Sequence, residues 1–190
     1  DLYSGEVLWQ NSDFPWLNKV KRSVLYGDQL TYEVSSFNNR DTDNGIHIVD
    51  AKNGKLSWEK TYAPGMNHNR QARPLFIGDD LWIQQGGKLD YDDEKKAKFN
   101  PVEVVSLNRE TGEANKSYPA GLGHCAPPVA TVNMIFSVVV EMTNLLTGKI
   151  VTNSITKSNC SRESLFIPAN GLIYASPKHC TCWPMLRGYV

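Results

Sequence analysis

Basic and imidazole side chains occur in several separate stretches of this chain, and their chemistry suits the binding of an anion. Arginine holds a carboxylate or a sulfate through two parallel hydrogen bonds from its planar guanidinium group. The candidate residues are His68, Arg70, Arg73, His124, Arg162 and His179. If the fold brings these loops together, we expect them to hold an anionic ligand. If it does not, they are ordinary solvated loop residues.

The four cysteines are a second group with reactive chemistry: Cys125, Cys160, Cys180 and Cys182. A bond between Cys180 and Cys182 would close a strained ring, so we expect Cys125 and Cys160 each to reach one member of that pair. Such bonds would close loops of tens of residues and stabilise the fold by about 3–4 kcal/mol each. The alternative is a zinc or copper site, although the spacing does not match Cys-x₂-Cys zinc modules. Its ligands would come from His124, Cys125, Cys160, His179, Cys180 and Cys182.

The elements that must position these residues are strands joined by a recurring turn. In Gly45–Trp58, apolar residues alternate with polar ones on both sides of Asp50–Gly54, as in a hairpin of half-buried strands. Asp bonds its own backbone two residues on, and Asn-Gly supplies the positive φ angles of a tight turn. The same signature, Asp or Asn followed four residues later by Gly, recurs at Asp1–Gly5, Asn108–Gly112 and Asn144–Gly148.

The repeat has the period of a β-propeller. The four glycines are 49, 58 and 36 residues apart, around the spacing of roughly 40–50 residues that propeller blades have. Trp9 and Trp58 follow their glycines by four residues, where the other two copies have Lys116 and Thr152. Four unrelated hairpins of a β-sandwich would also show such turns, but the flanking strands recur as well.

The stretch Val49–Trp58 resembles the repeat of quinoprotein-like (PQQ-like) β-propellers, which has an Ala-x-Asp-x-x-Thr-Gly-x-x-x-Trp character. The last third of the chain, with Ile167–Tyr174 followed by His179–Cys182, resembles the cysteine-bearing, secreted branch of these repeat proteins. The resemblance extends over almost the whole chain and implies an all-β propeller of four-stranded antiparallel blades.

We therefore expect residues 1–190 to form one propeller domain or propeller segment with about four blades. The expected blades are residues 22–62, 73–118, 127–155 and 164–190, with 6–10 added to the last. Pairing of Glu6–Gln10 with Met185–Val190 would close a four-bladed ring. The alternative is a segment of a larger propeller, which the resemblance favours. The mixed charge run Asp90–Lys98 is expected to be a solvated insertion in the second blade.

Because strand direction alternates, the second-to-third and fourth-to-first connections of every blade share one face of a propeller. This arrangement would bring the six basic and imidazole candidates, Lys178 and all four cysteines to that face, opposite the glycine turns. Ligands are commonly held by loops on a rigid scaffold, so this face is the expected site.

The bulk composition excludes several function classes. Lys and Arg total 20 against 20 Asp and Glu, so no basic field indicates nucleic acid. No apolar run reaches the roughly 18–20 residues that would cross a bilayer. The chain starts at Asp1 without a signal peptide, so we expect a mature, trimmed or partial protein. Four cysteines and the sequons at Asn115 and Asn159 favour a periplasmic or extracellular location, the periplasm being that of a bacterium.

Known cofactor and catalytic motifs are missing from the sequence. It has no Gly-x-Gly-x-x-Gly, phosphate loop, Gly-x-Ser-x-Gly, His-Glu-x-x-His or Cys-x-x-Cys-His. PQQ dehydrogenases that share the repeat use adjacent cysteines and a calcium site, and neither motif is recognisable here. We therefore expect no PQQ and no other cofactor, apart from the metal alternative above.

The sequence supports three interpretations of function. The first is a non-enzymatic, extracytoplasmic propeller that scaffolds a protein partner or binds an acidic glycan or small anion. The second is a polysaccharide-degrading lyase with His68 or His124 as base, Arg70 or Arg162 as anion clamp, and Tyr174 nearby. The third is a metal or electron-transfer module at the cysteine loop.

Overall fold

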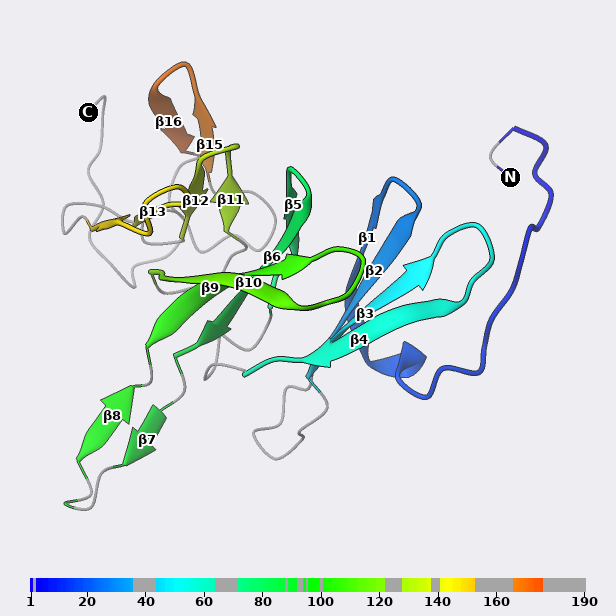
Figure 1. The fold of residues 1–190 in the computed structure, drawn as a ribbon, viewed down its shortest axis with the longest axis horizontal. Coiled ribbons are helices and arrows are strands. Elements are labelled where there is room, and N and C mark those ends of the chain that lie inside the picture. The colour runs from blue at the N-terminus through cyan, green and yellow to red at the C-terminus, as the bar shows by residue number, and fades with distance from the viewer. Residues whose placement is uncertain are drawn as a thin grey trace.

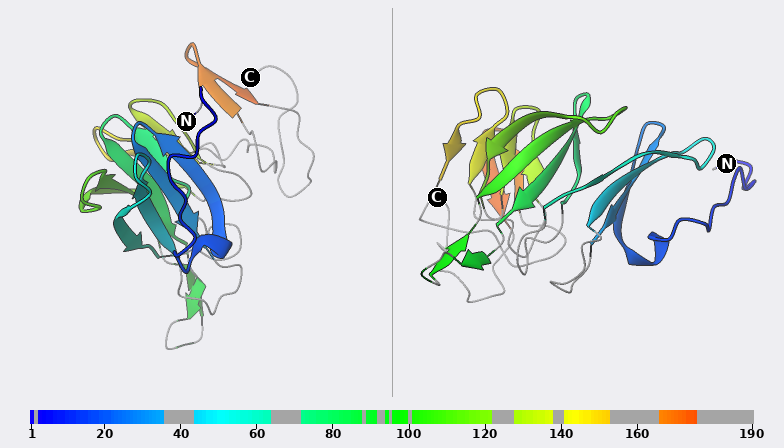
Figure 2. Two further views of the ribbon diagram at one scale, coloured as in Figure 1. Left: turned by 90° about the vertical axis from the view of Figure 1, so that its right-hand side faces the viewer. Right: turned by 60° about the horizontal axis from the view of Figure 1, so that its bottom comes forward.

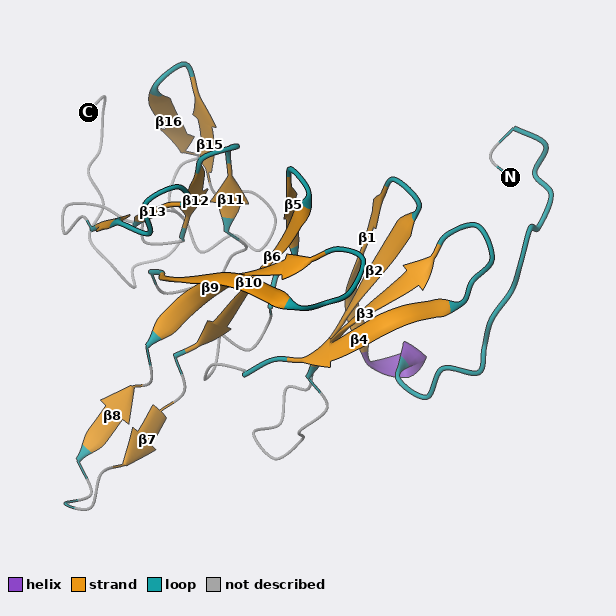
Figure 3. Cartoon of the chain, in the orientation of Figure 1, coloured by secondary structure: helices purple, strands orange, loops and turns teal. Residues whose placement is uncertain are grey.

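The fold consists almost entirely of antiparallel strands. A computed structural model of the chain describes residues 1, 3–35, 44–63, 72–87, 89–91, 94, 96–99, 101–121, 128–137, 141–152 and 166–175. Within this part, the only helical element is one 3-10 turn, Leu17–Lys19, and the remaining elements are strands (Figure 3).

Three sheets of four strands follow one another along the chain, and each is an antiparallel propeller blade. Blade 1 has the order β1-β2-β3-β4, with β1 Val20–Tyr26, β2 Gln29–Val34, β3 Gly45–Asp50 and β4 Leu56–Thr61. Blade 2 has the order β5-β6-β9-β10, with β5 Leu75–Ile77, β6 Asp80–Gly86, β9 Val102–Asn108 and β10 Ala114–Pro119. Blade 3 has the order β11-β12-β13-β14, with β11 Val129–Ala130, β12 Met134–Phe136, β13 Met142–Asn144 and β14 Ile150–Val151.

A fourth unit begins with the hairpin of β15 Phe166–Ala169 and β16 Leu172–Ala175, and β11 of blade 3 lies beside β15. The blades follow each other in an arc from the N-terminal segment to this hairpin (Figures 1 and 2). The prediction of an all-β propeller with four-stranded antiparallel blades is confirmed. Residues 185–190, expected to pair with Glu6–Gln10, lie outside the described part of the chain, and Glu6–Gln10 itself forms no strand.

The charged insertion in blade 2 has more structure than its composition indicated. Strands β7 Leu89–Tyr91 and β8 Ala97–Phe99 pair as a separate two-stranded hairpin between β6 and β9. It projects away from the blade in Figure 1. Lys96 and Glu94 near its tip are exposed and form an ion pair with each other.

Each recurring turn is closed by the same short hydrogen bonds. The amide of Gly112 donates to the carbonyl of Asn108, and the equivalent bonds close the turns at Gly5, Gly54 and Gly148. The Asn108 side-chain oxygen accepts from the amides of Glu110 and Thr111, at 2.8 and 3.1 Å. The donor and the acceptor of each bond lie within five residues of each other in the sequence, so the turn can be predicted from the sequence.

An aromatic ring from the segment that precedes a blade lies on the glycine turn of that blade: Trp58 comes from β4, and Trp9 from the N-terminal segment. Trp58 Nε1 donates to the Arg109 carbonyl at 2.7 Å, and Trp9 Nε1 donates to the Ala51 carbonyl at 2.7 Å. A Cβ atom added at Gly112 would come within 2.6 Å of the Trp58 ring. The ring therefore occupies the space that only a glycine leaves open.

The third of these contacts uses Tyr118, which the sequence repeat did not reveal. Its ring lies on Gly148 of blade 3, where an added Cβ would be 2.6 Å away. Tyr118 follows its glycine by six residues, the position held in blade 1 by Lys60, whose amine bonds the Gly112 carbonyl at 3.1 Å. The aromatic side chain has thus moved two residues along the strand while still reaching the turn.

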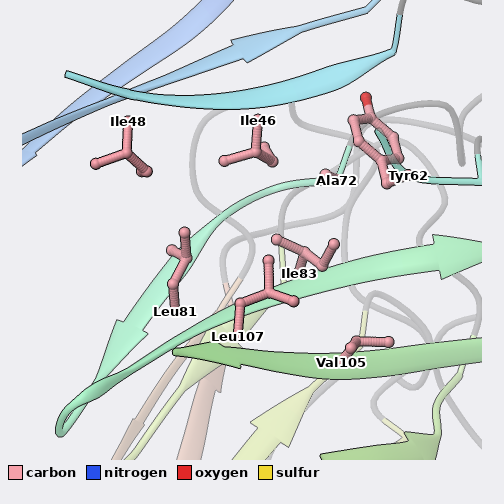
Figure 4. Close-up of a cluster of buried hydrophobic side chains, with 8 residues drawn as sticks. All are labelled: Ile46, Ile48, Tyr62, Ala72, Leu81, Ile83, Val105 and Leu107. Atoms are coloured by element: carbon pink, nitrogen blue, oxygen red, sulfur yellow. The ribbon is translucent and has the colours of Figure 1, made fainter. Parts of the chain in front are cut away.

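Apolar side chains fill the spaces between blades. Between blades 1 and 2 the fully buried Ile46 and Ile48 of β3 face Leu81, Ile83, Val105 and Leu107 (Figure 4). Between blades 2 and 3, Trp82 and Val104 pack with Ile135 and Leu145. The side chains alternate along β6, so Leu81 faces blade 1 and Trp82 faces blade 3.

We expect Gly112→Ala to destabilise the protein by about 2–4 kcal/mol. The alanine would have to adopt the backbone φ of +73°, which is unfavourable for a residue with a Cβ, and its Cβ would collide with the Trp58 ring. The control is Gly78→Ala in the same blade, where φ is +60° and nothing lies within 4 Å of the added atom. It should cost only about 1–2 kcal/mol. Urea unfolding measures both, and equal losses would contradict the role of the aromatic contact.

Candidate functional site

The structure describes only one residue of the predicted anion site. Arg73 lies just before β5, in the connection from β4 to β5. The other candidates lie outside the described residues and stay predictions: His68, Arg70, His124, Arg162, His179, Cys125, Cys160, Cys180 and Cys182. Tyr174, from the lyase interpretation, is on β16 and half exposed.

Arg73 is buried rather than presented to solvent. Only 5% of its surface is exposed, and its φ of +52° places it in the left-handed region. It lies beside Glu33 of β2, which is completely buried. In the sheet, Glu33 pairs with Arg22 of β1 on one side and Ile46 of β3 on the other.

Burial raises the pKa of the Glu33 carboxyl above its ordinary value of 4.5. The charges of Arg22 and Arg73 oppose this shift but do not cancel it. The backbone amides of Ala72 and Arg73 also approach the carboxyl and oppose the shift, without completing well-formed hydrogen bonds. Glu33 is therefore a buried carboxyl group with a raised pKa at the junction of blades 1 and 2.

Tyr62 joins the same buried polar group. Its hydroxyl donates to the Val34 carbonyl at 3.5 Å, and burial, followed by the nearby Glu33, raises its pKa. We define Glu33, Tyr62 and Arg73 as the buried polar cluster. Because its members are at most 6% exposed, the cluster acts in the packing of blades 1 and 2 and not on an external substrate in this conformation.

His47 is a histidine that the sequence gave no reason to select. It is 9% exposed, stacks on Trp16 with ring centroids 4.1 Å apart, and places Nδ1 3.0 Å from Glu59 Oε2. Burial lowers its pKa, and Glu59 partly offsets that effect. Trp16 also contacts Phe14 and Tyr32, so His47 completes an aromatic cluster on the side of blade 1 away from blade 2.

An open polar recess lies between blades 1 and 2 at the end of the molecule that carries the glycine turns. Its volume is about 360 Å³. Gln29 Nε2 bonds the Arg109 carbonyl across it at 3.0 Å, and Lys52 Nζ pairs with Asp28 at 2.5 Å. The Arg109 guanidinium lies 5.2 Å from the Tyr26 ring centroid. The lining residues are Gly27, Asp28, Gln29, Asp50, Ser57, Arg109 and Glu110.

The recess carries both signs of charge, and its charged side chains already have partners. Such a surface suits the polar rim of a binding interface better than a selective site for one ion. The sequence identified these segments as turns, but only blade packing brings the first turn of blade 1 next to the third-to-fourth turn of blade 2. No group of three or more His, Cys, Asp or Glu suited to a metal occurs among the residues described.

Two apolar side chains project from adjacent turns of blade 3. Val132 is 79% exposed and Leu146 is 74% exposed. Their turns are joined by a 2.8 Å bond from the Leu145 amide to the Asn133 carbonyl. We call Val132 and Leu146 the apolar tip of blade 3.

Comparisons with known proteins found similarity at the level of structure. No model of a protein family matches the chain, and no curated protein matches it either. The solved structure of BamB from Moraxella catarrhalis is similar at 14% sequence identity and a TM-score of 0.43. The match covers 78% of this chain and 40% of that one, so the chain spans less than half the length of that protein. Among the described residues, no helix is long and apolar enough to span a membrane.

We expect Glu33→Gln to change the pH dependence of stability. A carboxyl whose folded pKa is raised stabilises the fold fully below its unfolded pKa, near 4.5, and that contribution is lost as pH rises through the folded value. The variant should match the wild type near pH 4 and become the more stable protein toward pH 7. The gain should be about 1.4 kcal/mol for each pH unit between the two pKa values.

The control for this measurement is Glu113→Gln, which alters an exposed carboxylate in the β9–β10 turn. Urea unfolding at a series of pH values gives the comparison. A difference between Glu33→Gln and wild type that stays constant from pH 4 to pH 7 would show that Glu33 does not titrate in this way.

Proposed function

We propose that this chain is a non-enzymatic, extracytoplasmic propeller of the PQQ-like repeat type that binds a protein partner. The observation that carries the proposal is the apolar tip of blade 3, where Val132 and Leu146 are held in water on adjacent turns. Exposed apolar groups gathered at one place are typical of protein–protein contact sites.

The apolar tip is presented on a fixed backbone. The Asn144 side-chain oxygen accepts from the amides of Leu146 and Thr147, both at 2.9 Å. The ring of Tyr118 on Gly148 joins the same turn to blade 2. A side chain on a fixed turn loses little backbone entropy when a partner covers it, so more of its burial energy goes into affinity.

The polar recess supports the same proposal. The sheet topology places it at the same end of the blades as the apolar tip, because both are built from first-to-second and third-to-fourth turns. An apolar contact with a charged, hydrated neighbour is the usual composition of a protein interface. The partner would thus meet the face of the glycine turns.

The compartment, the absence of PQQ and the anionic ligand are proposed from the sequence. Four cysteines and two sequons support an oxidising, extracytoplasmic compartment. One sequon residue, Asn115, is exposed on β10 and bonds Asp80 through its side-chain amide at 3.2 Å. We propose no bound PQQ, since the chain lacks the adjacent cysteines of the PQQ dehydrogenases. An acidic glycan or small anion would be the ligand of the opposite face, where the basic candidates are predicted.

The double change Val132→Asp with Leu146→Asp should abolish partner binding. Each side chain contributes about 1.5–3 kcal/mol when fully covered, so the loss of both should lower affinity by about a hundredfold or more. The immobilised wild-type chain, the double variant and Val151→Asp would capture proteins from an extracytoplasmic extract of the source organism, with quantification by mass spectrometry. Val151 is 51% exposed on the outer strand β14 and serves as the matched control.

A protein captured by wild type and Val151→Asp but depleted with the double variant is the expected result. Equal capture by all three would show that the apolar tip is not the binding surface. Turnover of acidic glycans by the purified chain would contradict the non-enzymatic proposal and favour the lyase interpretation.

A further inference from the structure

The junction between blades 1 and 2 shows which side chains pack together where two blades meet. On the inner strands, Tyr26 of β1 stacks on Phe76 of β5, with ring centroids 4.5 Å apart and planes 8° apart. Farther out, Ile46 and Ile48 pack on the next blade. Each blade therefore offers one apolar side to the blade before it and the opposite apolar side to the blade after it.

At the N-terminal end of the arc, the side that meets a preceding blade is incompletely covered. Leu25 precedes the Gly27 turn by two residues, as Phe76 precedes the Gly78 turn. Phe76 is partly buried under Tyr26, whereas Leu25 is 62% exposed. Trp16 covers Val34 and Val49 deeper on the same side, so the open part lies toward the turns.

The segment Glu6–Gln10 lies beside blade 1 at the position that a fourth strand of a neighbouring blade would have. Trp9 lies on Gly54 in the way that Trp58 lies on Gly112. Asp1 also bonds Glu6 through the backbone, as Asn108 bonds Glu113. Yet Val7 and Leu8 are 75% and 63% exposed. The segment is thus placed as the outermost strand of a blade that would stand before blade 1.

At the other end of the arc, the hairpin β15–β16 exposes the side that in blade 1 faces the following blade. Ile167 pairs with Tyr174, and Ala169 pairs with Leu172 beside the turn. These positions match Val24, Thr31, Tyr26 and Gln29 of blade 1, which face blade 2. In blade 1 Thr31 is fully buried, but Ile167, Leu172 and Tyr174 are 64%, 57% and 52% exposed. The hairpin strands contain no charged residue.

We propose that these two ends bind each other between two copies of the chain, head to tail. The Ile167–Leu172–Tyr174 side of one copy packs on the Leu25 side of the next copy. The Glu6–Gln10 segment of that next copy then lies at the same junction. This junction continues an interface that the chain already forms between its own blades, and the smallest closed ring contains two copies.

We choose a second copy as the binding partner because β15–β16 and the N-terminal segment of one chain lie at opposite ends of the arc. Figure 1 and the right-hand view of Figure 2 both separate β15–β16 from the N-terminal segment by blades 1 to 3. The proposal uses neither the apolar tip nor the polar recess, so it is independent of the proposed function.

Sedimentation and light scattering of the purified 190-residue chain over a dilution series test this inference. The expected mass is at least twice 21.3 kDa at high concentration, falling on dilution. Leu25→Lys at one end and Leu172→Lys at the other should each raise the dissociation constant by about tenfold or more. Both sites are more than half exposed, so the fold should tolerate the lysines, and Tyr174→Lys is a second variant of the hairpin.

Mixing Leu25→Lys with Leu172→Lys gives the sharpest test. Each variant keeps the end that the other has lost, so a mixed pair retains one intact junction and should associate more tightly than either variant alone. Leu146→Lys, which alters the apolar tip, should keep the wild-type mass. A wild-type chain that is monomeric at every concentration, or a mixture no tighter than its components, would overturn the proposal.

Discussion

An aromatic ring lying on a glycine turn is the contact on which the blade arrangement depends. The contact needs a turn without a side chain beneath the ring and an acceptor for the indole N–H. Trp58 meets both needs, because its face covers Gly112 and its Nε1 bonds the Arg109 carbonyl. Trp58 and Tyr118 belong to one blade and the turns of Gly112 and Gly148 to the next, so this contact joins neighbouring blades.

The interior of the same junction combines apolar packing with an uncommon polar group. Ile46 and Ile48 supply aliphatic surface, whereas Glu33 brings a carboxyl to a fully buried position on β2, the strand next to the edge strand β1. Desolvation disfavours the ionised carboxylate, and the charges of Arg22 and Arg73 reduce that cost only in part. The backbone of Ala72 and Arg73 approaches this carboxyl, so Glu33 lies against the connection that leads into β5.

The described surface divides into an end rich in turns and the two open sides of the arc. Turn residues are rigid because their hydrogen bonds are local, so Leu146 and the polar recess can meet a partner without reorganisation. The open sides differ, since Leu25 and Leu172 lie where a neighbouring blade is packed elsewhere in the fold. The proposed partner binding and the proposed self-association would therefore use separate surfaces of the same fold.

The sequence determined the local part of this structure. The cap on the Asn108–Gly112 turn, the glycine and the alternating strands around it all depend on partners a few residues apart, so the blade pattern could be predicted. Tertiary structure decided the rest. Gln29 bonds the carbonyl of Arg109, 80 residues away, and Tyr118 replaces a tryptophan from a shifted position. Of the predicted anion site, only Arg73 is described, and its burial beside Glu33 depends on two blades meeting. No local pattern encodes such a contact, because its energy exists only when distant segments have packed.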